Sequence, residues 1–333
     1  MNHEKDGITR REFILEAGVL VAGVSGVSWM FGHERPKAET FIAKVDSYGA
    51  DIASVVRRGL AEIGVHPEEV RGKRILLKPN MVEVRRGAEH INTHPAVIRG
   101  AAEAFLSLGA KGVMVGEGAG HSRDSIYVLE ESGLAETLRE DRIPFVDLNN
   151  DSLFILPNRT GLTRLKSLIL PVSLKEVDWI VSVAKMKTHH WAGVTLSMKN
   201  LFGVMPGAVY GWPKNVLHQN GIERSILDIN AAVKPHFAIV DGIIGMEGDG
   251  PIMGDPKHAG VLVMGRNLPS VDATSARIMG IEPQRVHYLH VASKWLGPVA
   301  ENAIIQKGEN IAAVRQNFAL MDNIAAQKGL RIT

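Results

Sequence analysis

Segments with strand-like and helix-like patterns alternate along most of this chain, and this alternation constrains the fold more than any other feature. Short apolar runs rich in β-branched residues predict strands at residues 41–45, 74–78, 112–115, 143–146, 168–171, 179–184, 237–240 and 260–264. Helical spacing of apolar residues predicts helices at residues 52–63, 95–108, 125–138 (broken near Gly133), 195–202, 221–233 and 270–279. Strands separated by helices form βαβ units around a parallel sheet. We therefore expect an α/β fold, a mostly parallel sheet with flanking helices, in one large or two-lobed domain.

The chain divides into three predicted parts. Residues 1–38 carry the features of an export signal or tether, and residues 39–297 contain the alternating strands and helices. Residues 298–333 form a more polar tail that we expect to be mostly helical. A length of 333 residues suits one large α/β domain or two smaller ones.

The N-terminal segment resembles a secretory signal. The pattern T-R-R-E-F at residues 9–13 precedes an uncharged apolar stretch at residues 17–31, and a charged start before a short apolar run is typical of signal peptides. Arg10, Arg11 and Phe13 come close to the twin-arginine pattern, so the twin-arginine export machinery is a predicted partner. No clean cleavage site follows, and the segment could remain as a membrane tether, although 15 apolar residues are fewer than the roughly 20 that span a bilayer. We expect a periplasmic or other extracytoplasmic location.

Composition excludes several classes of function. Lys and Arg number 38 against 36 Asp and Glu, for a formal net charge of +2, so the chain lacks the dominant basic surface that nucleic-acid binding requires. The sequence contains no Cys, which rules out disulfides, Cys zinc sites and a Cys-ligated iron–sulfur cluster within it. The absence of Cys also excludes a thiol nucleophile.

Loops that follow predicted strands are the candidate sites, because ligands of open α/β sheets bind beyond the carboxyl ends of the strands. Residues 185–203 are the richest of these loops in charged and His side chains. Lys185 and Lys187 share one face if the strand continues, and Lys199 and Asn200 add donors in the next helix. These groups are candidates for binding a phosphate or carboxylate.

Histidines and carboxylates supply candidate acid–base and metal-binding groups. His189 and His190 can ligate a metal or transfer protons. Three carboxylates follow the predicted strand at residues 237–240, and they are Asp241, Glu247 and Asp249. Such carboxylates act as general bases or hold a hard cation. Because parallel strands bring their following loops to one edge of the sheet, we expect a histidine within reach of one of these carboxylates.

Two further loops contribute candidates. Lys78 and Asn80 close the predicted strand at residues 74–78, and they can add donors to a cofactor or ligand. The loop G-E-G-A-G-H-S-R-D at residues 116–124 contains Glu117 and His121, candidates for acid–base work. This loop is not the dinucleotide fingerprint, because its third glycine comes too early.

Two expectations concern the surroundings of the site. His94 precedes Pro95, which favours a cap for the helix at residues 95–108, with binding of a ligand as the alternative role. Residues 203–220 form a long irregular segment, and such segments in compact domains are usually functional or disordered. We expect this one to lie over the site with Tyr210 and Trp212 and to exclude water.

Four segments together resemble the family called domain of unknown function 362. They are K-M-K-T-H-H-W-A-G-V-T-L-S-M-K-N-L-F-G at residues 185–203, Y-G-W-P-K-N at 210–215, D-G-I-I-G-M-E-G-D-G-P at 241–251 and S-V-D-A-T-S-A-R-I-M-G at 270–280. Many members of that family are described as iron–sulfur proteins because a ferredoxin-type Cys domain follows the shared domain, and this Cys-free sequence does not take that label. A fainter likeness is to the lactate racemase family, two-lobed α/β enzymes with catalytic His and Lys and a nickel-bearing nucleotide cofactor. It rests only on a His- and Lys-rich α/β chain and assigns no residue.

Two hypotheses of function follow. The first is an exported enzyme that acts on a small anionic ligand, with a divalent metal or a phosphate-bearing cofactor as candidate cofactors. Its predicted ligand- and cofactor-binding residues are Lys78, Asn80, Lys185, Lys199 and Asn200. Its predicted catalytic residues are Glu117, Lys187, His189, His190 and Asp241, and its predicted metal ligands are His189, Glu247 and Asp249. The second hypothesis is a non-catalytic accessory protein that binds a ligand or metal for an extracytoplasmic redox or metal partner.

Overall fold

A computed structural model of the chain describes residues 37–83, 87–120 and 124–332. The predicted export signal with Arg10 and Arg11 lies outside these residues, and so does His121. Among the residues that are described, no helix is both long enough and apolar enough to cross a membrane.

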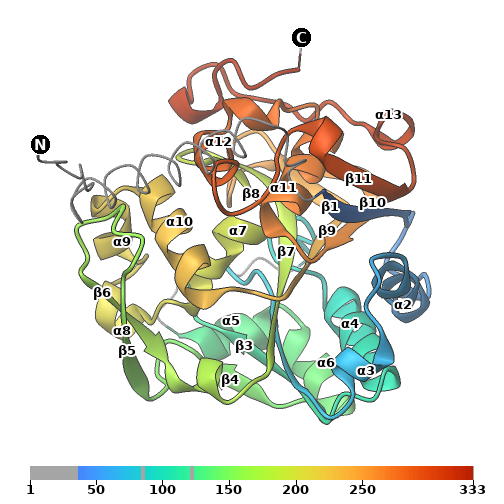
Figure 1. Cartoon of the computed structure of the whole chain (residues 1–333), viewed down its shortest axis with the longest axis vertical. Coiled ribbons are helices and arrows are strands. Elements are labelled where there is room, and N and C mark those ends of the chain that lie inside the picture. Colours follow the sequence, from blue (N-terminus) through green and yellow to red (C-terminus); the bar gives the residue numbers. More distant parts are fainter. Residues whose placement is uncertain (1–36, 84–86, 121–123, 333) are drawn as a thin grey trace, which may run out of the picture. The chain divides into compact units, whose positions relative to one another are not determined.

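Nine strands of the described chain form one mixed, mostly parallel sheet (Figure 1). The order is β11 (Ile304–Gly308), β1 (Ala38–Lys44), β10 (Asp255–Gly265), β9 (Phe237–Glu247), β7 (Trp179–His189), β2 (Arg74–Lys78), β3 (Gly112–Glu117) and β4 (Phe145–Asp147), and β8 (Gly193–Thr195) pairs with β7 off this path. The run from β9 to β4 is parallel throughout, whereas β10 is antiparallel to both β1 and β9. The predicted α/β fold with a mostly parallel sheet is confirmed.

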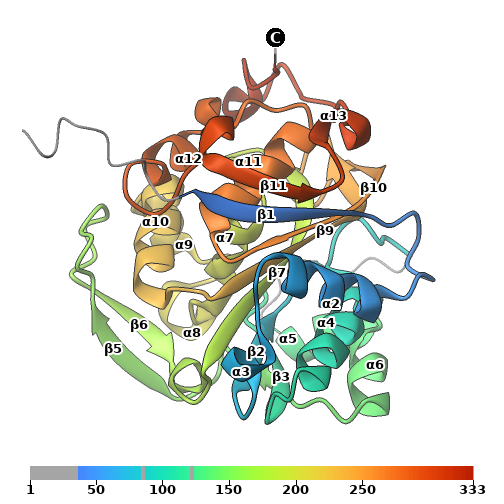
Figure 2. The same ribbon diagram turned by 45° about the vertical axis from the view of Figure 1, so that its right-hand side comes forward.

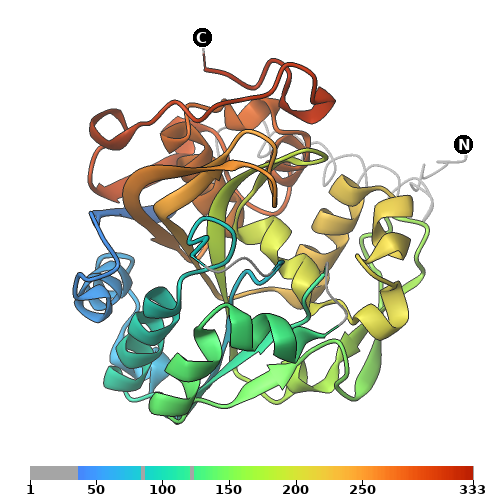
Figure 3. The same cartoon turned by 180° about the vertical axis from the view of Figure 1, so that it is seen from behind.

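Helices cover both faces of the sheet, and a hydrophobic core lies against each face. One layer contains α2 (Ile52–Glu62), α3 (Pro67–Val70), α4 (Pro95–Ser107), α5 (Ser125–Glu131) and α6 (Leu134–Glu140), and the other contains α7 (Ser197–Asn200), α10 (Ile222–Val233), α11 (Leu268–Ile278) and α12 (His287–Ala292). Figure 2 shows α2 and α4 on one side of β1 and α11 and α12 on the other, and Figure 3 shows the same layers from behind. Successive side chains of β1 alternate between the two cores, as the pleat requires.

Shorter elements lie outside the main sheet. β5 (Leu153–Pro157) and β6 (Ser167–Pro171) pair as a separate antiparallel hairpin. The segment that follows α7 folds into the 3-10 turn η2 (Leu201–Val204) and the short helices α8 (Gly207–Tyr210) and α9 (Asn215–Gln219). Two further 3-10 turns are η1 (Val172–Lys175) and η3 (Pro283–Arg285).

Several helices begin where the sequence places a cap. Asp51 caps α2 by accepting a hydrogen bond from Ser54 N at 2.9 Å. His94 caps α4, since its Nδ1 accepts a hydrogen bond from Ala96 N at 3.1 Å, as predicted. The helix predicted at residues 125–138 divides into α5 and α6 at Gly133, whose φ of 78° lies in the left-handed region that favours glycine.

Several strands are longer than predicted, and the extra length of β3, β7 and β9 moves candidate residues into the sheet. β7 runs to His189 instead of residue 184, and β9 runs to Glu247 instead of residue 240. β7 is buried along its whole length. Lys185 and Lys187 are therefore strand residues, and Lys185 lies in register with Asp241 of β9.

The prediction of a mostly helical tail at residues 298–333 is wrong. β11 pairs in parallel with β1 at the edge of the sheet, and the helical pieces η4 (Glu301–Ala303), α13 (Ile311–Val314) and η5 (Ala325–Gln327) are single turns. Phe318 of the tail is fully buried in one of the two cores. The tail pairs with a strand almost 270 residues earlier in the chain, because it supplies the backbone partners that β1 lacks on that side.

Candidate ligand-binding site

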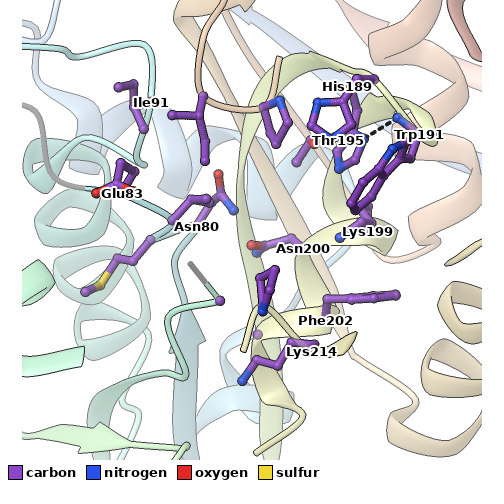
Figure 4. Close-up of a pocket in the computed structure, with 18 of the residues that line it drawn as sticks. Asn80, Glu83, Ile91, His189, Trp191, Thr195, Lys199, Asn200, Phe202 and Lys214 are labelled. Atoms are coloured by element: carbon purple, nitrogen blue, oxygen red, sulfur yellow. Dashed lines mark hydrogen bonds between the residues drawn. The ribbon is translucent and has the colours of Figure 1, made fainter. Parts of the chain in front are cut away.

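A cavity of about 740 Å³ opens at the carboxyl ends of β2, β3 and β7 (Figure 4). Its walls come from the turns after β2 and β3, the end of β7 with β8 and α7, residues 202–218, and the loop after β9. This is the position that ligands take in open α/β sheets, and the volume suits a small molecule. In Figure 4 one wall carries His189, Trp191, Thr195 and Lys199, and the facing side carries Asn80, Glu83 and Ile91.

A buried carboxylate anchors the short helix α7, which carries Lys199. Asp272 of α11 accepts hydrogen bonds from Ser197 N at 2.7 Å, Ser197 Oγ at 2.5 Å and Met198 N at 3.0 Å. Burial raises the pKa of Asp272 to about 7, although these hydrogen bonds oppose the shift. The three bonds fix the first turn of α7 and so place Lys199 and Asn200 in the cavity wall.

The ε-amine of Lys199 has no hydrogen-bond or ion-pair partner among the described residues. Its Nζ lies 3.8 Å from the centroid of the Phe202 ring, which is a cation–π contact. Burial and, to a smaller extent, the charge of Lys78 lower the pKa of Lys199 to about 7. The amine is therefore present in both its neutral and its charged form near neutral pH.

Lys214 supplies a second amine to this cavity; it is buried, and no carboxylate of the described chain pairs with it. Its Nζ donates hydrogen bonds to Asn149 Oδ1 at 2.5 Å and to the carbonyl oxygen of Met205. Burial lowers the pKa of Lys214 to about 7, although the charge of Glu117 opposes the shift. An anion in the cavity would therefore meet two amines whose charge no carboxylate of the described residues cancels.

Lys78 and Glu117 form a buried ion pair in the same cavity, with Nζ and Oε2 2.7 Å apart. Lys78 also donates to Pro79 O and Asn200 Oδ1, at 2.6 and 3.1 Å, and Glu117 accepts from Met81 N at 3.0 Å. Burial lowers the pKa of Lys78, and the carboxylate opposes this. Because the charges cancel and the three donors of Lys78 are used, this pair shapes the cavity and leaves no charge for a ligand.

His189 presents a hydrogen-bond donor to the cavity. Its Nδ1 accepts hydrogen bonds from Trp191 N at 2.9 Å and Ala192 N at 3.3 Å, so the proton of the neutral ring is on Nε2. Burial and the charge of Lys199 hold the pKa of His189 well below its usual value. Metal binding through Nε2 would require the proton to move to Nδ1 and would break both backbone hydrogen bonds.

Two buried polar atoms in the cavity wall lack a hydrogen-bond partner among the described residues. They are Asn80 Oδ1 and Thr195 Oγ1, in side chains of residues that are only 7% and 4% exposed. An unpaired buried polar group costs about 1–3 kcal/mol, and native proteins rarely leave one without a ligand or water. Both atoms are therefore expected to contact a bound polar group.

At the mouth of the cavity the structure brings together the loops after β7 and β9. His190 Nδ1 lies 3.9 Å from Asp249 Oδ1, and both side chains are exposed. This is the contact between a histidine and a carboxylate that the parallel sheet predicts. Burial lowers the pKa of His190, and the charge of Asp249 opposes that shift.

Lys185 and Asp241 do not line the cavity, because they pair with each other inside the fold. Lys185 Nζ lies 2.8 Å from Asp241 Oδ2, and both side chains are fully buried. Tyr48 completes the network, since its hydroxyl accepts from Lys185 at 2.8 Å and donates to Asp241 Oδ1 at 3.1 Å. Burial and the charge of Asp241 raise the pKa of Tyr48. The network ties the loop after β1, which contains Tyr48, to β7 and β9, and so it supports the fold.

Lys187 is also turned away from the cavity. Its Nζ donates to Ile91 O at 2.8 Å and to Pro251 O at 3.1 Å, so it ties together two of the loops that form the cavity walls. Burial holds the pKa of Lys187 well below its usual value. Of the three lysines predicted to bind an anion together, Lys199 alone lines the cavity.

The predicted metal ligands His189, Glu247 and Asp249 are not brought together. Glu247 Oε2 accepts from Ala319 N at 2.9 Å and lies 3.3 Å from Lys257 Nζ. Throughout the residues that the structure describes, no group of three His, Cys, Asp or Glu side chains could hold a metal ion.

Sequence reasoning did not predict that Lys214 and Trp191 line the cavity. Residues 203–220 do supply part of the wall, through Lys214 and His218, but Tyr210 lies in the core, where its hydroxyl accepts from Ile169 N at 2.7 Å. Trp191 also lines the cavity and is 54% exposed. No local pattern signals either residue, because both are placed by the path of the chain after α7 and β7.

The fold and the cavity define an α/β protein with a cavity lined by Lys and His side chains at the carboxyl ends of its strands. The chain belongs to the family described as Domain of unknown function (DUF362), whose profile matches residues 75–277, more than half of the sequence. The family resemblance expected from the motifs is thereby confirmed.

Similarity to individual proteins is more distant. The chain is 28% identical over 218 residues to the "Thylakoid-associated protein sll1697" of Synechocystis, and the match covers 65% of each chain. A crystal structure of a Thermotoga maritima protein is 14% identical, with a TM-score of 0.36 over 65% of this chain and 56% of that one. The lactate racemase apoprotein of Thermoanaerobacterium thermosaccharolyticum is also 14% identical, with a TM-score of 0.41 over 73% of this chain and 58% of that one. The chain thus spans less than two thirds of the length of each of these proteins.

Proposed function

We propose that the protein is an exported enzyme that binds a small anionic ligand in the cavity and transfers a proton through Lys199. The observation that carries this proposal is the Lys199 amine, which lines the cavity, lacks a partner among the described residues and has a pKa of about 7. The export part rests on the sequence pattern at residues 9–13 alone.

Binding of the anion follows from the donors in one wall. The charged form of Lys199, the Nε2–H of His189 and the hydroxyl of Thr195 supply three donors from β7, β8 and α7. Lys214 adds positive charge that no described carboxylate cancels. A carboxylate and a phosphate offer the acceptor oxygens that such donors take, so a phosphate-bearing cofactor would use the same wall.

Proton transfer follows from the protonation equilibrium of the same amine. A general acid–base group works best when its pKa lies near the working pH, and burial brings Lys199 to about 7. In the fraction of the complex in which Lys199 is neutral, His189, Thr195 and Lys214 hold the anion. The neutral amine then takes a proton from the bound ligand, becomes an ammonium beside the anionic group, and returns the proton in the reverse step. His189, with Nδ1 occupied by backbone donors, orients the ligand and does not act as a base.

A second candidate function is a non-catalytic accessory protein that delivers the ligand to an extracytoplasmic redox or metal partner. The observation that favours it is the state of Glu117, the buried carboxylate of the cavity, which is already engaged by Lys78 and two backbone amides. The buried carboxylate of the cavity is therefore not available as an acid partner for Lys199.

Calorimetric titration with acetate and with inorganic phosphate tests the anion site. The unsubstituted protein should bind at least one of them, and Lys199→Met should weaken that binding by tenfold or more, since a charge-assisted hydrogen bond contributes about 1.5–3 kcal/mol. Lys111→Met is the matched control. This lysine is exposed and lies just before the amino end of β3, whereas the cavity opens at the carboxyl end of that strand. Equal binding by the Lys199 variant would remove the basis of the proposal.

Proton exchange separates the two candidate functions. In heavy water, the enzyme should exchange the hydrogen on the carbon next to the carboxylate of a bound carboxylic acid for deuterium. Lys199→Met should stop this exchange. Tight binding without any exchange would favour the accessory protein.

A further inference from the structure

One side of the cavity is apolar, and a small anion such as acetate or phosphate would leave this side exposed to water. Ile91, Phe202, Ile252 and Met253 line it together with Trp191. Met253 is 74% exposed and Trp191 54% exposed, and both stand at this one cavity. Single exposed apolar side chains are ordinary, whereas an apolar wall beside convergent polar groups is typical of a site for a ligand with both kinds of surface.

The ring of Trp191 is held in place although it is exposed. It contacts the His190 ring at a centroid distance of 4.6 Å and the His218 ring at 5.0 Å, both in T-shaped geometry. Its backbone amide is bound to His189 Nδ1. The indole therefore forms a fixed aromatic surface on the wall that also carries Lys199, as Figure 4 shows. A fixed, half-exposed indole can stack with a ligand at little cost in side-chain entropy.

We propose that the ligand is an aromatic anion, a carboxylate or phosphate group attached to an aromatic ring, with the anionic group at Lys199, His189 and Thr195 and the ring against Trp191. This inference rests on the proposed anion site and adds the class of molecule that the site selects. The polar atoms of the wall take the charged end, and the ring covers the apolar surface of Trp191 and Met253 that would otherwise stay in water.

Calorimetry with four probes tests the proposal on the full chain. The probes are acetate, benzoate, inorganic phosphate and phenyl phosphate, titrated at pH 6.5. In at least one pair the aromatic member should bind at least tenfold more tightly than its simple partner, because ring burial and stacking together exceed that factor. The pair that shows the difference tells whether the anionic group is a carboxylate or a phosphate.

Substitutions at Trp191 assign the effect to the indole. Trp191→Ala should reduce the preference for the aromatic probe to less than threefold, and Trp191→Phe should retain most of it. Trp295→Ala is the control, since this tryptophan is also partly exposed and lies outside the cavity. It should leave all four affinities unchanged.

The outcomes separate this inference from the proposed function. If both members of each pair bind equally, or if the preference survives in Trp191→Ala, the aromatic ligand is excluded while the anion site stands. If none of the four probes binds, the anion site is overturned and the aromatic ligand with it.

Discussion

Lys185 and Lys199 lie in the same segment, residues 185–203, yet replacing each of them by Met should have opposite effects on stability and on anion affinity. Lys185→Met removes one member of a fully buried ion pair, in which Nζ and Asp241 Oδ2 are 2.8 Å apart. Lys199→Met removes an amine that has no hydrogen-bond or ion-pair partner among the described residues. Met keeps most of the apolar stem in both variants, so the difference isolates the ammonium group.

The expected magnitudes follow from these surroundings. Without Lys185, Asp241 keeps the Tyr48 hydroxyl and the His94 amide, each at 3.1 Å, but loses its only charged partner within the described chain. An uncompensated buried charge costs about 3–5 kcal/mol, a large part of the roughly 5–15 kcal/mol by which proteins are stable.

Lys199→Met should leave the free energy of unfolding unchanged or slightly higher. Burial already disfavours the charged amine, as its pKa of about 7 indicates, and the substitution removes that penalty. Anion affinity, in contrast, should fall by tenfold or more.

Urea unfolding followed by circular dichroism, together with calorimetric titration of the anion, measures both effects. The double variant Lys185→Met/Asp241→Asn should regain most of the lost stability, because it removes the buried charge as well. The argument is refuted if Lys185→Met is as stable as the unsubstituted protein and loses the anion, since Lys185 would then belong to the anion site.

Three further predictions can be checked with the same material. Anion affinity should be constant below about pH 6 and fall by about tenfold per pH unit well above pH 7, because only the ammonium form of Lys199, with its pKa of about 7, pairs with an anion; a flat profile in calorimetry from pH 5.5 to 8.5 would contradict this. Gly203→Ala should destabilise the protein by about 1–3 kcal/mol in urea unfolding, since a Cβ there would lie 1.9 Å from Glu117 Oε1 and 2.5 Å from Lys78 Cε, whereas Gly112→Ala, with nothing within 4 Å, should change little. Replacing Arg10 and Arg11 together by Lys should trap folded protein in the cytoplasm, and undiminished export in cell fractionation would exclude the twin-arginine pathway.

The order of strands and helices was predictable because it depends on local patterns. Apolar runs and helical spacing located β2, β3, β7 and β9 and most of the longer helices, and caps such as His94 located their starts. Parallel strands place their following loops at the same edge of the sheet. This rule correctly predicted that the loops after β2, β3 and β7 lie together. Lys78, Asn80, Glu117, His189 and Lys199 were named from their place at the end of a predicted strand, in the loop after it or in the next helix. All five line one cavity.

The sequence could not tell which of these side chains would be free. Lys185 and Lys199 look alike in a string of letters, yet β7 continues past residue 184 and sets Lys185 in register with Asp241, which neutralises it. Lys214 and Trp191 reach the cavity through the path of loops that no local pattern specifies.

What the sequence by itself determined is most of the strands and longer helices before residue 280, their α/β arrangement and the edge of the sheet where charged loops meet, because short-range periodicity and chain connectivity govern all three. Only the tertiary structure decided that the tail completes the sheet, that Lys185 and Lys187 support the fold, and that Lys199 faces a cavity without a partner among the described residues. The physical reason is that strand pairing and the burial of a charge depend on groups far apart in the chain, and their free energies are settled only when those groups meet.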